Sequence, residues 1–219
     1  MDHSSSLYKA VRMANIVLLA TSLALMLDQS VASALSRVDL IPHWRSEDRA
    51  LVVVDKTGDR KWHEASRHAV NAFNKTASGT GLRLTWTSGS GACKPGGNRI
   101  EICQEPYQSL GDDMHLDRQG LTDLRLGPDR EQAHIGGTAI IVCSNCGLDA
   151  PRRRVVATHE LGHALGLEHK LRLGSLMYPS GGSDKPDGQD VQTLRDLCAH
   201  VDAEDRCGAL NVRAGPLCF

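Results

Sequence analysis

Three histidines and a glycine stand at a spacing that suits one metal ion. His159 and His163 are four residues apart, so on an α-helix their imidazoles lie one turn apart on the same face. Gly166 can adopt a left-handed conformation that ends the helix and brings His169 round as a third nitrogen ligand. Three neutral imidazoles leave one position of a Zn²⁺ ion for water, which is the arrangement of a catalytic zinc and not of a structural one.

Glu160 follows the first of these histidines and supplies a carboxylate that can both accept and return a proton. A bound Zn²⁺ would lower the pKa of its water to about 7 and polarise a substrate carbonyl. Glu160 would then take the proton from the attacking water and pass it to the leaving amine. The short His-Glu-x-x-His pattern arises by chance in about 2% of chains of this composition. When Gly166 and His169 are also required at their positions, that rate falls to roughly one in ten thousand.

The extended pattern His-Glu-x-x-His-x-x-Gly-x-x-His resembles the signature of the metzincin zinc endopeptidases. A few residues later, Leu-Met-Tyr-Pro is similar to the matrixin form of the methionine turn beneath the zinc. The resemblance implies that Met177 is the structural methionine of that turn. It also implies that Tyr178 and Pro179 form one wall of the pocket for the residue after the scissile bond. The opening of a last helix at 187–191 is likewise similar to the matrixins.

The same resemblance implies the fold class, which is α+β: a metzincin-like zincin with a twisted mixed β-sheet, an active-site helix and a C-terminal helix. One catalytic Zn²⁺ is implied, with a protein or peptide as substrate. An extended peptide would lie antiparallel to an edge strand of the sheet. We expect residues 121–126 to be that edge.

Some positions depart from the matrixin pattern. Lys170 follows the third histidine, where many matrixins have serine. The histidine and aspartate cluster that holds a structural zinc in vertebrate matrixins is not reproduced, because His115, Asp117 and His134 have an unsuitable spacing, and we predict no second zinc. Loop carboxylates leave a Ca²⁺ site open, at Asp112, Asp113 and Asp117.

The elements that must position these residues follow from local patterns. Apolar residues at three- and four-residue spacings predict a helix that begins near residue 60, and Asp149 with Pro151 marks the start of the helix that carries the first two histidines. Alternating or β-branched runs predict the strands. Strands are expected at 49–55, 82–86, 99–103, 121–126 and 138–143, and helices at 60–77, 152–166 and 189–201.

The amino terminus reads as a secretory signal peptide covering residues 1–34. Lys9 and Arg12 precede an apolar run at 14–27, and Ala32-Ser33-Ala34 is a small-residue cleavage pattern. The alternative is a membrane anchor, but the run is shorter than the ~20 apolar residues that span a bilayer. We expect residues 35–219 to form a single metzincin-like catalytic domain with its core at about 49–201 and a cysteine-containing tail at 202–219.

Charge gives little reason to expect a polyanionic partner. Lys plus Arg total 25 and Asp plus Glu total 26, for a formal net charge of −1. We therefore expect no nucleic-acid partner and no membrane contact after signal cleavage. We also expect a monomer. The run Arg152-Arg153-Arg154 is most simply a solvated helix face, or alternatively a bias toward acidic substrate residues.

Seven cysteines fit an oxidising, extracellular compartment, where thiols pair. Cys93 with Cys103 and Cys198 with Cys207 are the short-range candidates, and Cys143 with Cys146 suits a local disulfide better than a zinc or redox pair. The residues between the signal peptide and the first strand contain no cysteine that could act as a matrixin latency switch. A hypothesis for latency is that Cys207 or Cys218 caps the zinc.

The sequence predicts a secreted zinc-dependent endopeptidase with Glu160 as general base. The alternative is a non-catalytic or latent zinc-bound secreted binding module of the same fold. Glu160 discriminates between the two, because a binding module has no need of a general base beside three intact ligands. A zinc hydrolase that acts on a non-peptide amide would share the same residues.

Overall fold

The computed structural model describes residues 41–45, 48–107, 119–127 and 134–199. The predicted signal peptide and the tail at 202–219 lie outside these residues. No helix in the described ranges is long and apolar enough to cross a membrane. Each predicted strand and helix is present, with bounds shifted by a few residues. The strands are β1 (Ala50–Asp55), β2 (Arg83–Ser88), β3 (Arg99–Glu105), β4 (Gly120–Leu126) and β5 (Ile135–Cys143), and the helices are α2 (Arg60–Thr76), α3 (Ala150–Ala164) and α4 (Gly188–Ala199).

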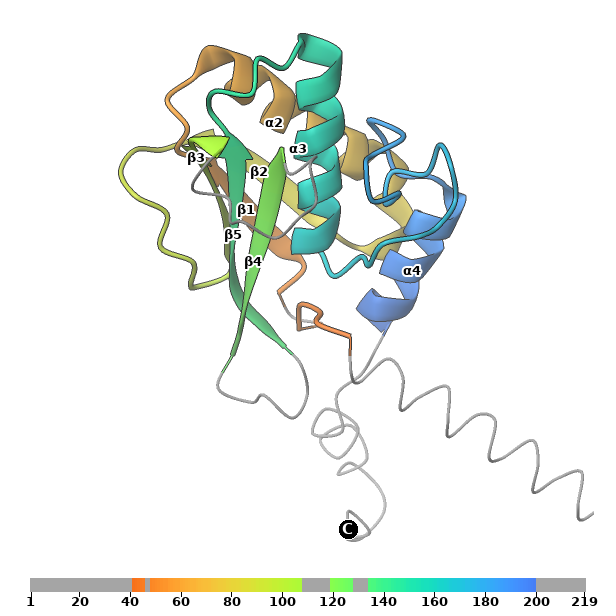
Figure 1. Ribbon diagram of the computed structural model, residues 1–219. Coiled ribbons are helices and arrows are strands. Elements are labelled where there is room, and N and C mark those ends of the chain that lie inside the picture. The colour runs from red at the N-terminus through yellow and green to blue at the C-terminus, as the bar shows by residue number, and fades with distance from the viewer. Residues whose placement is uncertain (1–40, 46–47, 108–118, 128–133, 200–219) are drawn as a thin grey trace, which may run out of the picture. The chain divides into compact units, whose positions relative to one another are not determined.

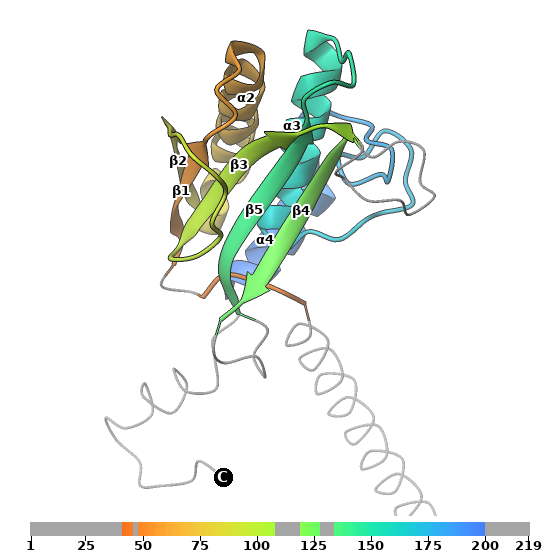
Figure 2. The same ribbon diagram turned by 60° about the vertical axis from the view of Figure 1, so that its left-hand side comes forward.

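The described strands form one mixed sheet in the order β2-β1-β3-β5-β4. β1 pairs in parallel with β2 and β3, and β3 pairs in parallel with β5. β4 pairs with β5 alone and runs antiparallel to it. The expected mixed sheet is therefore confirmed, and the segment 121–126 is an edge strand as predicted (Figure 2).

Helices α2 and α3 pack side by side against one face of the sheet (Figures 1 and 2). Asp59 caps the amino end of α2, and its side chain accepts a hydrogen bond of 2.7 Å from the backbone N–H of Lys61. Its buried face includes Trp62, Ala65 and Phe73, which follow the three- and four-residue spacing of the sequence. Burial of these side chains fixes the helix on the sheet and provides a surface for α3.

The core lies between this sheet face and the two helices. Aliphatic side chains of the three central strands contribute to it, together with side chains of the helices and of the segments that follow α3. Trp62 and Phe73 of α2 and Leu161 of α3 are among its largest fully buried side chains. Helix α3 is thus held through its apolar side chains, and its other face remains available for polar side chains.

Two disulfides reinforce the described part of the chain. Cys93 pairs with Cys103 and Cys143 pairs with Cys146, which confirms two of the predicted pairs. Of the third candidate pair, Cys198 with Cys207, only Cys198 is described, and it carries a free thiol. Cys198 lines a small apolar pocket with leucines that include Leu194, and burial raises the pKa of its thiol. Cys207 lies outside the described residues.

Candidate metal centre

Helix α3 carries His159 and His163 on one face. Asp149 caps the amino end of the helix, since its carboxylate accepts a hydrogen bond of 2.8 Å from the backbone N–H of Arg152, and Pro151 occupies the first turn. The helix runs without interruption to Ala164, so the four-residue spacing places the two imidazoles one above the other. Regular helix geometry therefore fixes two of the three candidate ligands.

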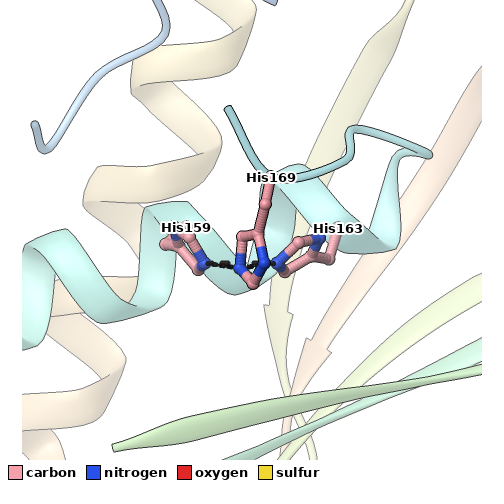
Figure 3. A group of neighbouring side chains, drawn as sticks. All are labelled: His159, His163 and His169. Atoms are coloured by element: carbon pink, nitrogen blue, oxygen red, sulfur yellow. Dashed lines mark hydrogen bonds between the residues drawn. The ribbon is translucent and has the colours of Figure 1, made fainter. Parts of the chain in front are cut away.

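Gly166 ends the helix and reverses the chain. Its φ is +95°, a left-handed conformation, and its backbone N–H donates to the carbonyl oxygen of His163. A Cβ at this position would collide with the carbonyl oxygen of Pro42, so glycine is required for space as well as for φ. The turn brings His169 back over the helix, as Figure 3 shows.

The three Nε2 atoms converge on one point (Figure 3). The distance is 3.2 Å from His159 to His163, 3.2 Å from His159 to His169 and 3.1 Å from His163 to His169. In the described ranges this is the single group of three or more His, Cys, Asp or Glu side chains close enough to share a metal ion. Nitrogens bound to Zn²⁺ at about 2.0–2.1 Å in tetrahedral geometry stand roughly 3.3 Å apart, so the cluster has the size of a zinc site.

Hydrogen bonds on the other side of two rings set the tautomer. Nδ1 of His159 donates to the carbonyl oxygen of Leu176 at 2.7 Å, and Nδ1 of His163 donates to that of Leu167 at 2.8 Å. Because a carbonyl only accepts, the hydrogen of each neutral ring is on Nδ1 and the Nε2 lone pair faces the cluster. Bare lone pairs at this separation repel one another, and a shared cation removes that repulsion.

The electrostatics keep the rings neutral. Burial, reinforced by the neighbouring His159, lowers the pKa of His163 to about 4. Burial also lowers the pKa of His159, against the hydrogen bond to Leu176, and it lowers the pKa of His169. Neutral imidazole is the form that binds metal, so three convergent, neutral nitrogen donors fit Zn²⁺.

Met177 lies directly beneath the helix and is fully buried. Gly162 makes room for it, since a Cβ on Gly162 would lie 2.5 Å from the sulfur of Met177. The carbonyl oxygen of Met177 accepts a hydrogen bond of 2.8 Å from the backbone N–H of Lys170, next to His169. The methionine turn thus contacts α3 and the segment of the third histidine together.

Comparison with known proteins agrees with this geometry. The matrixin family model of peptidases matches residues 43–197, which is more than half of the chain. The chain belongs to the matrixin family. It is therefore a zinc metalloprotease, with peptides or proteins as its class of substrate.

No curated protein matches the chain. Among solved structures, the chain is similar to high choriolytic enzyme 1, a hatching enzyme zinc-protease from the medaka fish Oryzias latipes. The two share 13% sequence identity with a TM-score of 0.40, over 73% of this chain and 94% of that one.

Glu160 of this matrixin points toward the edge of the sheet. The residue is 7% exposed, and its carboxylate oxygen Oε2 accepts a hydrogen bond of 2.6 Å from the hydroxyl of Thr122 on β4. Nothing in the local sequence singles out Thr122, because its contact depends on how β4 crosses α3. The one signal in the sequence is the glycine at position 120, two residues earlier, because a glycine within a strand indicates that another part of the chain approaches closely. Here the approaching group is the side chain of Glu160.

Tyr178 and Pro179 lie at the end of the methionine turn. Tyr178 is half-buried and Pro179 is exposed. The following segment is held to α3, because Arg152 donates to the carbonyl oxygen of Ser180 at 2.8 Å. Gly181 follows at φ +69°, and a Cβ there would lie 2.7 Å from Cγ1 of Val155. The two residues thus precede a segment that is anchored to the active-site helix.

The arginine run on α3 is not a fully solvated face. Arg152, Arg153 and Arg154 are all half-buried, and two of them have polar partners. Arg152 also donates to the side-chain oxygen of Gln119, beside β4, and Arg154 lies 3.6 Å from the carboxylate of Asp184. These arginines instead join α3 to the segments on either side of it, and only the tertiary fold supplies their partners.

Other predicted sites fall partly outside the described residues. The Ca²⁺ candidates Asp112, Asp113 and Asp117 lie there, as do His115 and the latency candidates Cys207 and Cys218. His134 is described, and it is buried with its ring 5.1 Å from that of His43.

Proposed function

We propose that this matrixin is a secreted endopeptidase in which His159, His163 and His169 hold one Zn²⁺ and Glu160 is the general base. The observation that carries the proposal is the convergence of three Nε2 atoms, 3.1–3.2 Å apart, in front of the helix that also bears Glu160. The bonds from Nδ1 to Leu176 and Leu167 support it, because they orient two of the ligand rings before any metal binds.

The chemistry divides between the metal and the chain. When bound here, Zn²⁺ supplies a Lewis acid that polarises a carbonyl and acidifies water. Glu160 supplies a carboxylate next to the first ligand, at a position with little contact with bulk solvent. It takes up the proton of the attacking water and transfers that proton to the leaving amine nitrogen.

Strand β4 is the proposed place for the substrate backbone. One side of β4 pairs with β5, and its other side is the edge of the described sheet. An extended peptide can add to such an edge by main-chain hydrogen bonds. Tyr178 and Pro179 remain the proposed wall of the pocket for the residue after the scissile bond.

Secretion is supported by the amino-terminal pattern and by the two disulfides, which persist in oxidising compartments. The full chain, expressed in a secreting host, should therefore appear in the medium with Leu35 as its first residue. Amino-terminal sequencing tests this directly. Retention of the chain in the cell with residues 1–34 intact would contradict it.

The test of catalysis is hydrolysis of a quenched fluorescent peptide library by the secreted chain, with and without a zinc chelator. The wild type should cleave internal peptide bonds, and the chelator should stop it. Glu160→Gln should bind zinc as the wild type does and lose 10²-fold or more in turnover, because only proton transfer is removed. Glu168→Gln is the matched control, since Glu168 is an exposed glutamate near the same site, and it should keep activity.

One result would favour the non-catalytic zinc-binding module. If the wild type binds one zinc per chain but cleaves nothing in the library, the endopeptidase proposal fails. If Glu160→Gln cleaves as fast as the wild type, the enzyme stands and Glu160 is not its base.

A further inference from the structure

Strand β4 forms a slot for the side chain of Glu160. The hydroxyl oxygen of Thr122 lies 2.6 Å from Oε2 of Glu160 and 3.0 Å from its backbone carbonyl oxygen. Two residues earlier on the same strand face, a Cβ on Gly120 would lie 2.7 Å from Cγ and 2.9 Å from Oε1 of Glu160. The glutamate side chain thus rests where β4 has no side chain, beside the hydroxyl that follows.

The contact between Thr122 and Glu160 has the chemistry of a strong hydrogen bond. An ionised carboxylate can only accept, and the threonine hydroxyl has one hydrogen to donate. A separation of 2.6 Å falls in the range of charge-assisted O–H···O⁻ bonds. When Glu160 holds a proton, the hydroxyl can turn to the carbonyl oxygen of Glu160 instead, so it keeps an acceptor throughout the reaction.

The donor is also rigid. Thr122 lies in the middle of β4, opposite Ile140 of β5, and its branched Cβ restricts the rotation of the side chain. The carboxylate of Glu160 has two oxygens. Because Thr122 holds Oε2 against β4, the carboxylate cannot rotate freely, and the position of the other oxygen, Oε1, is fixed as well. Thr122 therefore converts the position of the edge strand into an orientation of the glutamate.

We propose that Thr122 is a positioning residue that orients the carboxylate of Glu160 through its hydroxyl. The proposal rests on the proposed role of Glu160 as general base. Because β4 is also the strand to which the substrate backbone would add, Thr122 links the base to the element that sets the position of the scissile bond. Thr122 itself gives and receives no proton in the net reaction, and the proton that Glu160 accepts goes to the leaving nitrogen.

The kinetic test uses Thr122→Val, which keeps the shape and removes the hydroxyl, and Thr122→Ser, which keeps the hydroxyl. We expect the valine variant to lose 10- to 100-fold in kcat, with KM and zinc affinity within about twofold of the wild type. The serine variant should recover kcat to within about threefold. Thr138→Val is the matched control, since Thr138 is a buried threonine on the adjacent strand β5 whose hydroxyl has no partner among the described residues, and its kcat should stay unchanged.

An unchanged kcat in Thr122→Val would overturn the proposal. A serine variant as slow as the valine variant would overturn it too, because shape and not the hydroxyl would then matter.

Crystal structures of the zinc-loaded wild type and Thr122→Val supply a readout that needs no activity. The carboxylate of Glu160 should contact Thr122 in the wild type and leave β4 in the variant. If the carboxylate keeps its place in the variant, the proposal is wrong. Should the wild type cleave no peptide, the proposed function fails, and these structures still decide whether Thr122 orients the glutamate.

Discussion

The ammonium group of Lys170 lies 2.8 Å from Oδ1 of Asp190, whose side chain is fully buried at the start of α4. Lys170 follows the third candidate ligand, and its backbone N–H also donates to the carbonyl oxygen of Met177. One residue thus ties the His169 segment to the methionine turn and to α4. Many matrixins have serine at this position, whereas here Lys170 holds the segment through an ion pair with Asp190.

Replacing Lys170 with Met should destabilise the protein by about 3 kcal/mol, because it leaves the buried Asp190 carboxylate without its cation. Zinc affinity should fall 10- to 100-fold as the His169 segment loosens. Urea unfolding and zinc titration measure the two effects. Arg172→Met is the control, since Arg172 pairs with Asp187 at a more exposed place and should cost less than about 1 kcal/mol. Equal losses in the two variants would contradict a special role for Lys170.

Replacing Gly166 with Ala should be more costly than the same change at Gly147. Both glycines have positive φ, +95° and +64°, so each alanine is strained by about 1–2 kcal/mol. Only at Gly166 does the added Cβ meet another group, the carbonyl oxygen of Pro42, whereas nothing lies within 4 Å at Gly147. We expect Gly166→Ala to lower the free energy of unfolding, measured with urea, by at least about 3 kcal/mol. The same variant should also bind zinc more weakly. Similar losses at both sites would show that backbone strain alone decides the cost.

Local patterns explain why so much of the metal site could be predicted. Helix geometry alone brings His159 and His163 together. The turn after the helix depends on the conformational freedom of one residue, Gly166. Both relationships operate within eight positions of the chain. The strand and helix assignments succeeded for the same reason, because hydrophobic periodicity and capping residues such as Asp149 act over short ranges.

Contacts between distant elements could not be predicted in this way. Thr122 and Glu160 are 38 residues apart, and Arg152 and Gln119 are 33 apart. Each pair depends on β4 lying beside α3, which no local pattern encodes. The run Arg152-Arg153-Arg154 is an example. Its composition predicted a solvated face, but in the fold two of its members have polar partners from other segments.

Acid should weaken the fold partly through Glu101 of β3. Burial alone would raise the pKa of this carboxyl, but hydrogen bonds from Lys56 and from the backbone N–H of Lys94 outweigh burial and hold the pKa below its ordinary value of 4.5. A lowered pKa in the folded state means that the ionised carboxylate stabilises the fold above about pH 4.5. That stabilisation is lost as the pH falls through the folded-state pKa.

Glu101→Gln should therefore reduce the dependence of stability on pH below 4.5, and it should destabilise the protein most near neutral pH. Urea unfolding of the metal-free protein at a series of pH values between about 6 and about 3 measures this pH dependence. Glu64→Gln is the control, because Glu64 is an exposed residue of α2 whose pair with Arg60 is 3.8 Å long. A pH profile of Glu101→Gln that runs parallel to the wild type would contradict the assignment.

The two disulfides should differ in their effect on stability. Cys93 and Cys103 are 10 residues apart, and Cys143 and Cys146 are 3 apart. On the loop-entropy model the longer loop contributes about 3 kcal/mol and the shorter one about 2 kcal/mol. Replacing each pair with alanines and measuring urea unfolding should give that order. The opposite order would show that the bridge before α3 acts on the native packing of the helix start and not only on the unfolded chain.

Zinc binding should stabilise the folded chain through the three histidines. A ligand that binds only the native state at about 100 times its Kd adds about 2.7 kcal/mol to the free energy of unfolding. Thermal or urea unfolding with added zinc, and again after chelation, should show this difference in the wild type and lose it in His163→Ala. His68→Ala is the control, because His68 on α2 contacts Asp184 outside the cluster and should keep the zinc effect. Zinc stabilisation that survives in His163→Ala would place the metal elsewhere in the chain, since His163 contributes one of three convergent nitrogens and its loss leaves only two.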